Sequence, residues 1–279
     1  MRNLLRGLLP ARARDLARSL LGRNQPYGLA ESELRRLQGL PRYAATEVKF
    51  FGRPLQVCDA ASFLSAWREI FIQQIYRFRA TGPEPLVIDA GANLGLASIA
   101  CRQQYPGARV IALEPDPQIC QLLRNNLQAH SAETVQILNC AAWDADESLL
   151  FAQDQADSGR VGLCGQVRVQ GMRFLTLLEQ HERVDFLKMD IEGAEVRVLL
   201  DCESELDRVE NIFVEYHSAV AQPQQLSQLL GVLERAGFRY YVQQAGVCSR
   251  QPLLHRQAEA GFDLQLNIFG TRAAGDDSV

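Results

Sequence analysis

The feature that most constrains the fold is an alternation of short apolar runs with helix-like segments between residues 85 and 236. The apolar runs predict buried strands at 86–88, 109–113, 135–138, 184–189 and 212–216. The segments between them predict helices at 96–104, 117–129, 194–200 and 224–236. This order is typical of a mostly parallel sheet with helices on both faces. The sequence therefore predicts an α/β fold.

Other segments depart from the alternation. Residues 148–170 carry three glycines and are expected to be irregular or hairpin-like. Residues 238–242 and 264–270 predict an antiparallel pair that closes the sheet. Upstream, residues 60–78 predict a helix with Asp59 as its cap.

The N-terminal segment, residues 1–23, interleaves six arginines with leucines against one acid, Asp15, and contains Pro10. We expect an amphipathic segment that packs its leucines on the rest of the protein. Contact with an anionic membrane surface and a transit peptide are the alternatives. The predicted organisation is a basic helical extension at 1–58, a cofactor-binding domain at 59–272 and a disordered tail at 273–279.

The charge and the cysteines narrow the functional classes. A net charge of −4 argues against a surface that tracks nucleic-acid phosphates. No uncharged run reaches the roughly 18 apolar residues of a membrane span. The seven cysteines contain no C-x-x-C pair that would suggest zinc or a redox dithiol. The reducing cytoplasm is the simpler expected location.

A glycine-rich loop, D-A-G-A-N-L-G, follows the first predicted strand, where ligands of open α/β sheets bind. It contains Asp89, Gly91, Asn93 and Gly95. A dinucleotide fingerprint has its second glycine where Asn93 stands, which disfavours a nicotinamide cofactor. The glycines allow a tight turn and close approach of a ligand, and Asp89 and Asn93 can bond its polar groups.

Two further strand ends extend this prediction. Glu114 follows the second strand, 25 residues beyond Asp89, and can take both hydroxyls of a ribose. A turn of small residues, with Asn139 and Ala141, follows the third strand and could accept a flat base. The predicted cofactor-binding residues are thus Asp89, Gly91, Asn93, Gly95, Glu114, Asn139 and Ala141.

Ionisable residues crowd the ends of the fourth and fifth strands, and we predict Asp190, Glu192, Glu215 and His217 as catalytic residues. Carboxylates beside a histidine could deprotonate a hydroxyl, with a rate that rises through a pKa near 6.5. They could equally hold a divalent cation. Lys188 could supply the positive charge instead, provided that its strand stays regular.

The remaining ionisable residues of this region have simpler interpretations. Glu195 is interpreted as an acid in the first turn of a helix, where the helix dipole favours it. His130, His181 and His255 have no partnered spacing and are expected at the surface.

Four motifs together resemble the FkbM family of S-adenosylmethionine-dependent methyltransferases: V-I-D-A-G-A-N-L-G, V-I-A-L-E-P-D, L-K-M-D-I-E-G-A-E and V-E-Y-H. The resemblance covers about residues 69–245, and residues 68–78 are similar to a segment found before the glycine loop in many members. Met172 and Met189 depart from the family pattern, and residues 1–60 match no motif of it.

The resemblance implies a class I, Rossmann-like methyltransferase sheet of seven strands, mostly parallel with an antiparallel last strand. It also implies methylation of a hydroxyl on a sugar, glycan or natural product, and cofactor roles for Asp89, Gly91, Asn93, Gly95 and Glu114. We expect Asp190 and His217 to orient or deprotonate the acceptor, with Glu192 and Glu215 supporting them or a metal. A catalytically silent scaffold and a nicotinamide-dependent oxidoreductase are the alternatives.

Overall fold

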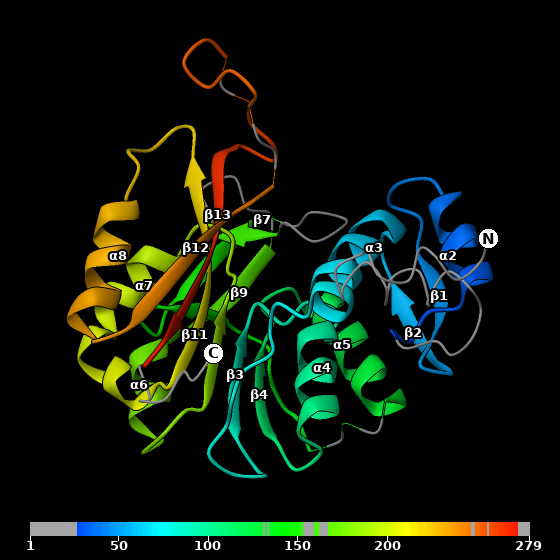
Figure 1. Cartoon of the computed structure of the whole chain (residues 1–279), viewed down its shortest axis with the longest axis horizontal. Coiled ribbons are helices and arrows are strands. Elements are labelled where there is room, and N and C mark those ends of the chain that lie inside the picture. The colour runs from blue at the N-terminus through cyan, green and yellow to red at the C-terminus, as the bar shows by residue number, and fades with distance from the viewer. Residues whose placement is uncertain are drawn as a thin grey trace, which may run out of the picture.

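The computed structural model describes residues 27–130, 132, 134–152, 159–161, 167–246, 249–255 and 257–272. Its centre is a seven-stranded sheet with the order β12, β13, β11, β10, β3, β4, β5 (Figure 1). The strands are β3 (Leu86–Ala90), β4 (Arg109–Leu113), β5 (Gln136–Leu138), β10 (Phe186–Met189), β11 (Asn211–Ala219), β12 (Arg239–Ala245) and β13 (Phe262–Thr271). The sheet confirms the α/β prediction.

Strand direction identifies the type of sheet. Neighbouring strands from β5 to β11 pair in parallel, and β13 runs antiparallel between β11 and β12. This is the strand order of class I methyltransferases, with the antiparallel last strand that the sequence predicted. The chain reverses its direction of winding between β3 and β10, and ligands of open α/β sheets bind at such a switch point.

Helices cover both faces of the sheet (Figure 1). One face carries α4 (Leu96–Gln104) and α5 (Pro117–Ala129), and the other carries α6 (Phe174–Glu179), α7 (Glu195–Asp201), the 3₁₀ helix η2 (Glu203–Arg208) and α8 (Leu226–Arg235). Successive side chains of a strand point to opposite faces, so Val87 joins one apolar core and Ile88 the other. All five residues of β3 are buried, as expected for a central strand covered on both sides.

The glycine-containing stretch forms a second, four-stranded sheet with the order β6, β9, β7, β8. Its strands are β6 (Ala141–Trp143), β7 (Ser148–Ala152), β8 (Arg160–Val161) and β9 (Val167–Arg173). The antiparallel pairing of β7 with β8 and β9 agrees with the predicted hairpin. Residues 141–143, expected in a turn, instead form β6, because they pair in parallel with β9.

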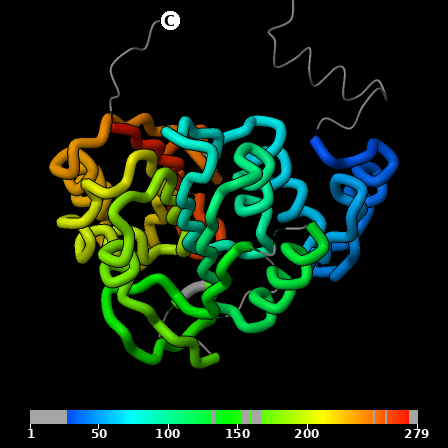
Figure 2. The backbone as a smooth tube through the Cα atoms, turned by 90° about the horizontal axis from the view of Figure 1, so that it is seen from below, coloured from blue at the N-terminus to red at the C-terminus, as the bar shows by residue number. Residues whose placement is uncertain are grey.

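An N-terminal unit, residues 27–78, lies at one end of the molecule, and Figures 1 and 2 place it beside α4 and α5. It contains α2 (Glu31–Gln38), the antiparallel pair β1 (Thr46–Phe50) and β2 (Arg53–Val57), α3 (Ala60–Trp67) and the π-helical turn η1 (Arg68–Gln73). The described part of the expected helical extension therefore also contains strands. Phe50 and Leu55 share one apolar core with helices α4 and α5, so this unit is joined to the main sheet by packing.

The predicted helix at 60–78 begins and ends at identifiable residues. Asp59 caps α3 by accepting a hydrogen bond from the Ser62 amide at 2.9 Å, as predicted. The helix ends sooner than expected, at Gln73, because Gln74 takes a left-handed conformation with φ of 60°.

Two predictions concern segments outside the described residues. The amphipathic interpretation of residues 1–23 and the disordered tail at 273–279 both remain predictions. Within the described part of the chain, no helix has the length and apolarity to cross a bilayer.

Candidate active site

The glycine loop after β3 is locked to the turn that follows β10. Gly91 has φ of 79°, and a Cβ atom there would overlap the carbonyl oxygen of Asp190. Gly95 has φ of 90°, and its Cβ would lie 2.8 Å from Leu123 in the core. The sequence suggested that these glycines admit a ligand, whereas protein atoms fill the space at both positions. Gly91 still lines the pocket described next, and Gly95 begins helix α4.

Glu114 lies at the end of β4 as predicted, and its carboxylate organises two loops. One carboxylate oxygen accepts from the Asn93 amide and the other from the Asp116 amide, both at 2.9 Å. Burial raises the pKa of Glu114 to about 7, against the two amide hydrogen bonds, which lower it. Asn139 supports this loop because its side chain donates to the carbonyl oxygens of Glu114 and Pro115.

A narrow pocket runs along these strand ends. Gly91, Asn93 and Glu114 form its polar side, and Ala141 and Phe151 belong to its apolar side. Asn139 and Gly95 are not among its lining residues, so the structure gives them supporting positions beside the pocket. Gly91, Asn93, Asp190 and Glu192 line both this pocket and a larger cleft, so the two spaces are neighbours.

A buried ion-pair chain links the glycine loop to the end of β10. The Lys188 ammonium lies 3.5 Å from a carboxylate oxygen of Asp89 and 3.5 Å from one of Asp190. It also donates to the Gly91 carbonyl at 2.8 Å. Asp89 accepts a hydrogen bond from Ser98 at 2.7 Å and lines neither space. Lys188 thus supplies the positive charge that the sequence left conditional.

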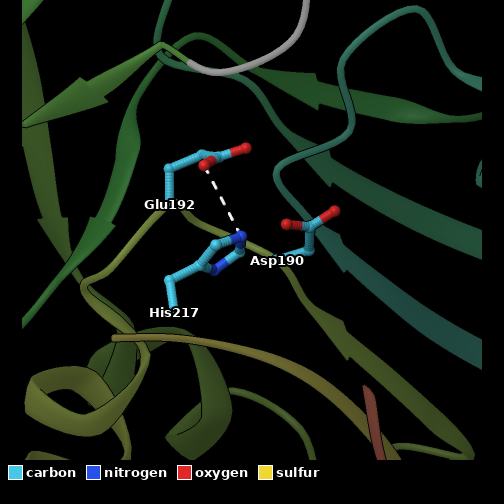
Figure 3. Close-up of side chains that lie close together, drawn as sticks. All are labelled: Asp190, Glu192 and His217. Carbon is cyan, nitrogen blue, oxygen red and sulfur yellow. Dashed lines mark ion pairs between the residues drawn. The ribbon is translucent and has the colours of Figure 1, made fainter. Parts of the chain in front are cut away.

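The four predicted catalytic residues do converge, and Figure 3 shows three of them facing one another. His217 Nε2 lies 3.6 Å from Glu192 and 3.7 Å from Glu215, and all four residues line the cleft. The imidazole side chain is only 1% exposed. Asp190 and Glu192 come from the turn after β10, and Glu215 and His217 from β11.

Burial and mutual charge shift proton affinities within the group Asp190, Glu192, Glu215 and His217, which we call the catalytic cluster after its predicted role. Burial raises the pKa of the Glu192 and Glu215 carboxyls, and the negative charge of Asp190 raises both further. Burial alone would lower the pKa of His217, but the charge and hydrogen bond of Glu195, with Glu192 and Asp190, raise it to about 10. The expected pKa near 6.5 is therefore corrected upward.

Glu195 is a site residue that sequence reasoning missed. It is fully buried at the start of α7, and one of its oxygens lies 3.0 Å from His217 Nδ1. Its predicted place in the first turn of a helix is correct, whereas its burial against His217 was not predicted. Gly193 is the sequence signal that could have identified Glu195. A glycine two residues before Glu195 allows the tight turn that brings this carboxylate back to the strand end.

Within the described residues, Asp190, Glu192 and His217 are the group that could hold a metal ion. Each offers one ligand atom, and these atoms lie within 4.8 Å of one another. Carboxylate oxygen and imidazole nitrogen together suit a divalent cation.

The cleft beyond the cluster has a volume of about 630 Å³. Its far wall is the N-terminal unit, which the sequence did not connect with the site. Ser62, Ser65 and Glu69 from α3 and η1 face the cluster across this space, and Ala245 and Gln265 close it from the β12 and β13 side. We call this space the acceptor cleft.

Comparison with known proteins matches the Methyltransferase FkbM domain to residues 89–240, which is more than half of the chain. The chain belongs to the FkbM methyltransferase family. It is therefore an S-adenosylmethionine-dependent methyltransferase, as the resemblance implied. This result decides against the nicotinamide alternative.

Two curated relatives carry methyltransferase names. Methyltransferase 1 of Beauveria bassiana (strain ARSEF 2860) is 27% identical over 176 residues, which cover 53% of this chain and 71% of that protein. Methyltransferase sdnD of Sordaria araneosa is 27% identical over 212 residues, covering 62% and 80%. The crystal structure of Methyltransferase FkbM from Methylobacillus flagellatus KT aligns with a TM-score of 0.48 at 17% identity, covering 72% of this chain and 46% of that one.

The narrow pocket offers groups that fit the cofactor of this FkbM family member. A carboxylate has about four acceptor positions, so Glu114 keeps capacity for two ribose hydroxyls after its two amide bonds. The side-chain oxygen of Asn93 is buried and has no hydrogen-bond partner in the described chain. Ala141, Ala142 and Phe151 offer an apolar surface for a flat base.

Proposed function

We propose that the enzyme methylates a hydroxyl oxygen of a sugar, glycan or other small natural product bound in the acceptor cleft. The observation that carries this proposal is the position of Asp190 and Glu192, which line both the narrow pocket, where the cofactor would bind, and the acceptor cleft. A hydroxyl placed between them would lie at the junction of the two spaces, beside the catalytic cluster. When bound, S-adenosylmethionine supplies an electrophilic methyl group there.

In this proposal His217 accepts the hydroxyl proton at Nε2, and Asp190 orients the hydroxyl. The Lys188 ammonium holds Asp190 in place. Glu192 and Glu215 stabilise the imidazolium that forms, since both lie within 4 Å of Nε2. Alignment of the acceptor oxygen in the cleft contributes much of the acceleration.

The charge of the cleft restricts the acceptor. Its lysine and arginine, Lys188 and Arg42, are already paired with aspartates. In the described chain Glu69, Glu192 and Glu215 have no lysine or arginine within ion-pair distance. A phosphate or carboxylate on the acceptor would lie beside these carboxyl groups without a lysine or arginine left to pair with it, which costs free energy in a partly buried site. The acceptor is therefore neutral or cationic.

The same cluster offers a cation site as the alternative arrangement, and the position of Lys188 favours the metal-free one. Like charges at short range need a positive group between or beside them. Lys188 meets this need for Asp190, and protonated His217 meets it for Glu192 and Glu215. Activity that vanished in EDTA and returned with Mg²⁺ or Mn²⁺ would favour the cation instead.

The test uses S-adenosylmethionine with a labelled methyl group and a panel of hydroxylated acceptors in matched neutral, amino and phosphorylated forms. We expect label on oxygen in a neutral or amino acceptor, identified by mass and NMR of the product. His217→Ala should lower kcat/KM roughly 100-fold or more, whereas His255→Ala, at an exposed histidine, is the matched control. Transfer only to phosphorylated acceptors, or to nitrogen, contradicts the proposal. Cofactor binding without transfer to any acceptor favours the silent scaffold.

A further inference from the structure

The catalytic cluster rests on a turn that wraps around one carboxylate. The turn after β10 takes left-handed conformations at Glu192, with φ of 58°, and at Gly193, with φ of 101°. These conformations direct the amides of Ile191 and Gly193 to one oxygen of Glu195, at 3.2 and 3.0 Å. Glu195 is therefore fixed by the backbone of the same turn that presents Asp190 and Glu192 to the cleft.

The same oxygen of Glu195 lies 3.0 Å from His217 Nδ1. The backbone carbonyl oxygen of Glu215 lies 3.1 Å from this nitrogen as well. Both neighbours are hydrogen-bond acceptors, since the Glu195 oxygen already receives two amide hydrogens and the other atom is a backbone carbonyl oxygen. Nδ1 must therefore carry a proton in every charge state of the ring, and the neutral ring has its lone pair on Nε2.

The other side of the ring faces the cleft. Nε2 lies near Glu192 and Glu215 at distances too long for hydrogen bonds, and Figure 3 shows it directed toward Glu192 and Asp190. The ring of Phe262 packs on the imidazole with centroids 4.8 Å apart. The imidazole therefore has a carboxylate at Nδ1, an aromatic ring against its face, and Glu192, Glu215 and the lining of the acceptor cleft on its Nε2 side.

We propose that Glu195 is a positioning residue that fixes the proton of His217 on Nδ1 and leaves Nε2 as the proton acceptor of the site. The consequence of this proton placement for methyl transfer rests on the proposed function, whereas the placement itself does not. Sequence alone had given Glu195 only a favourable position at a helix start.

The charge of Glu195 also supports the charged ring. Four carboxylates face His217: Glu195 from α7, Glu215 from its own strand, and Asp190 and Glu192 from the turn after β10. Glu195 alone lies on the Nδ1 side. Its removal should therefore affect the Nδ1 proton and the ring pKa together, whereas removal of the Glu192 charge should affect only the ring pKa.

The experiment is NMR of the full-length protein labelled with ¹⁵N-histidine, without cofactor or acceptor and with chelator present. The chain has four histidines, so His217→Asn assigns the His217 signals by difference. We expect a strongly downfield Nδ1 proton that exchanges slowly and a ring pKa well above the ordinary 6.5. Glu195→Gln should move this proton upfield and lower the ring pKa by about 1–3 units.

Two matched variants distinguish the positioning of the His217 proton from the effect of a lost charge and from a general effect of substitution on the fold. Glu192→Gln should lower the ring pKa and leave the Nδ1 proton in place. Glu203→Gln, at an exposed ion pair with Arg235, should reproduce the wild-type spectrum. If Glu195→Gln does not fold, Glu195→Asp, which keeps the charge but withdraws it by one methylene, should weaken the Nδ1 signal with a smaller change in pKa.

An unchanged Nδ1 proton and ring pKa in folded Glu195→Gln would overturn the proposal, because the Glu215 carbonyl would then suffice. With an acceptor in hand, Glu195→Gln should move the midpoint of the pH profile downward and lower the kcat reached on the alkaline plateau, with little change in the Kd of S-adenosylhomocysteine. If the NMR result holds but no methyl reaches oxygen, the proposed function fails and the role of Glu195 toward His217 stands.

Discussion

Replacing Glu114 with alanine should weaken S-adenosylhomocysteine binding at least tenfold. If Glu114 binds the ribose as we predict, the variant removes two charge-assisted hydrogen bonds, each worth about 1.5–3 kcal/mol. It also frees the Asn93 and Asp116 amides that Glu114 now holds. Calorimetric titration measures the effect, and Glu84→Ala, at an exposed glutamate, is the control. An unchanged Kd in the folded variant would remove Glu114 from cofactor recognition.

The rate of methyl transfer should rise with pH through the alkaline range. His217 accepts a proton only when its ring is neutral, and its pKa is raised to about 10. A larger neutral fraction at higher pH therefore means more active enzyme, with a midpoint well above 6.5. The pH profile of kcat/KM for free enzyme measures this, and a plateau already reached at pH 7 would contradict a histidine base.

Residue types and their strand positions predicted correctly that the four side chains converge, but not the environment of each one. The pattern identified Asp190, Glu192, Glu215 and His217, because parallel strand ends meet at one edge. It left the role of Lys188 conditional and did not predict that of Glu195, because these roles depend on how regular a strand remains and on which way a turn folds back. Those facts arise from tertiary packing, and a single sequence does not display it.

At the scale of elements, two glycines with nearly equal φ angles form a matched pair. Gly91 and Gly52 have φ of 79° and 78°, but a Cβ overlaps Asp190 only at Gly91 and meets nothing within 4 Å at Gly52. Gly52→Ala should cost about 1–2 kcal/mol of unfolding free energy for the left-handed conformation alone. Gly91→Ala should cost distinctly more, since two loops must separate. Equal losses in denaturant unfolding would show that the loops separate freely.

Periodicity predicted every strand of the central sheet, since buried parallel strands appear as apolar runs. It extended the helix at residue 60 too far and assigned residues 141–143 to a turn. Both differences have local causes: the left-handed Gln74 ends η1, and pairing with β9 makes a strand of small residues. The strands β1 and β2 were missed because short antiparallel strands at an end of the molecule leave little pattern.

For the whole molecule, unfolding free energy should fall as pH rises from about 4.5 to 10. The pKa values of Glu114, Glu192, Glu215 and His217 are all raised in the folded protein. The folded state therefore holds protons that the unfolded chain has released, which makes the slope negative. Thermal unfolding in matched buffers measures the trend. Glu192→Gln should flatten it, and a Tm that rises from pH 6 to pH 9 would contradict it.

One wall of the acceptor cleft lies inside the range that matches the FkbM domain, and the other wall lies outside it. The catalytic cluster lies inside the matched range of residues 89–240, whereas Ser62, Ser65 and Glu69 lie before it. Substitutions at Ser62, Ser65 and Glu69 can therefore change the shape and charge of the cleft while leaving the residues proposed for transfer in place. This division makes the enzyme a candidate for chimeras. In such a chimera, the segment that corresponds to residues 27–78 is taken from one family member and joined to the methyltransferase domain of another, in order to exchange substrate preference.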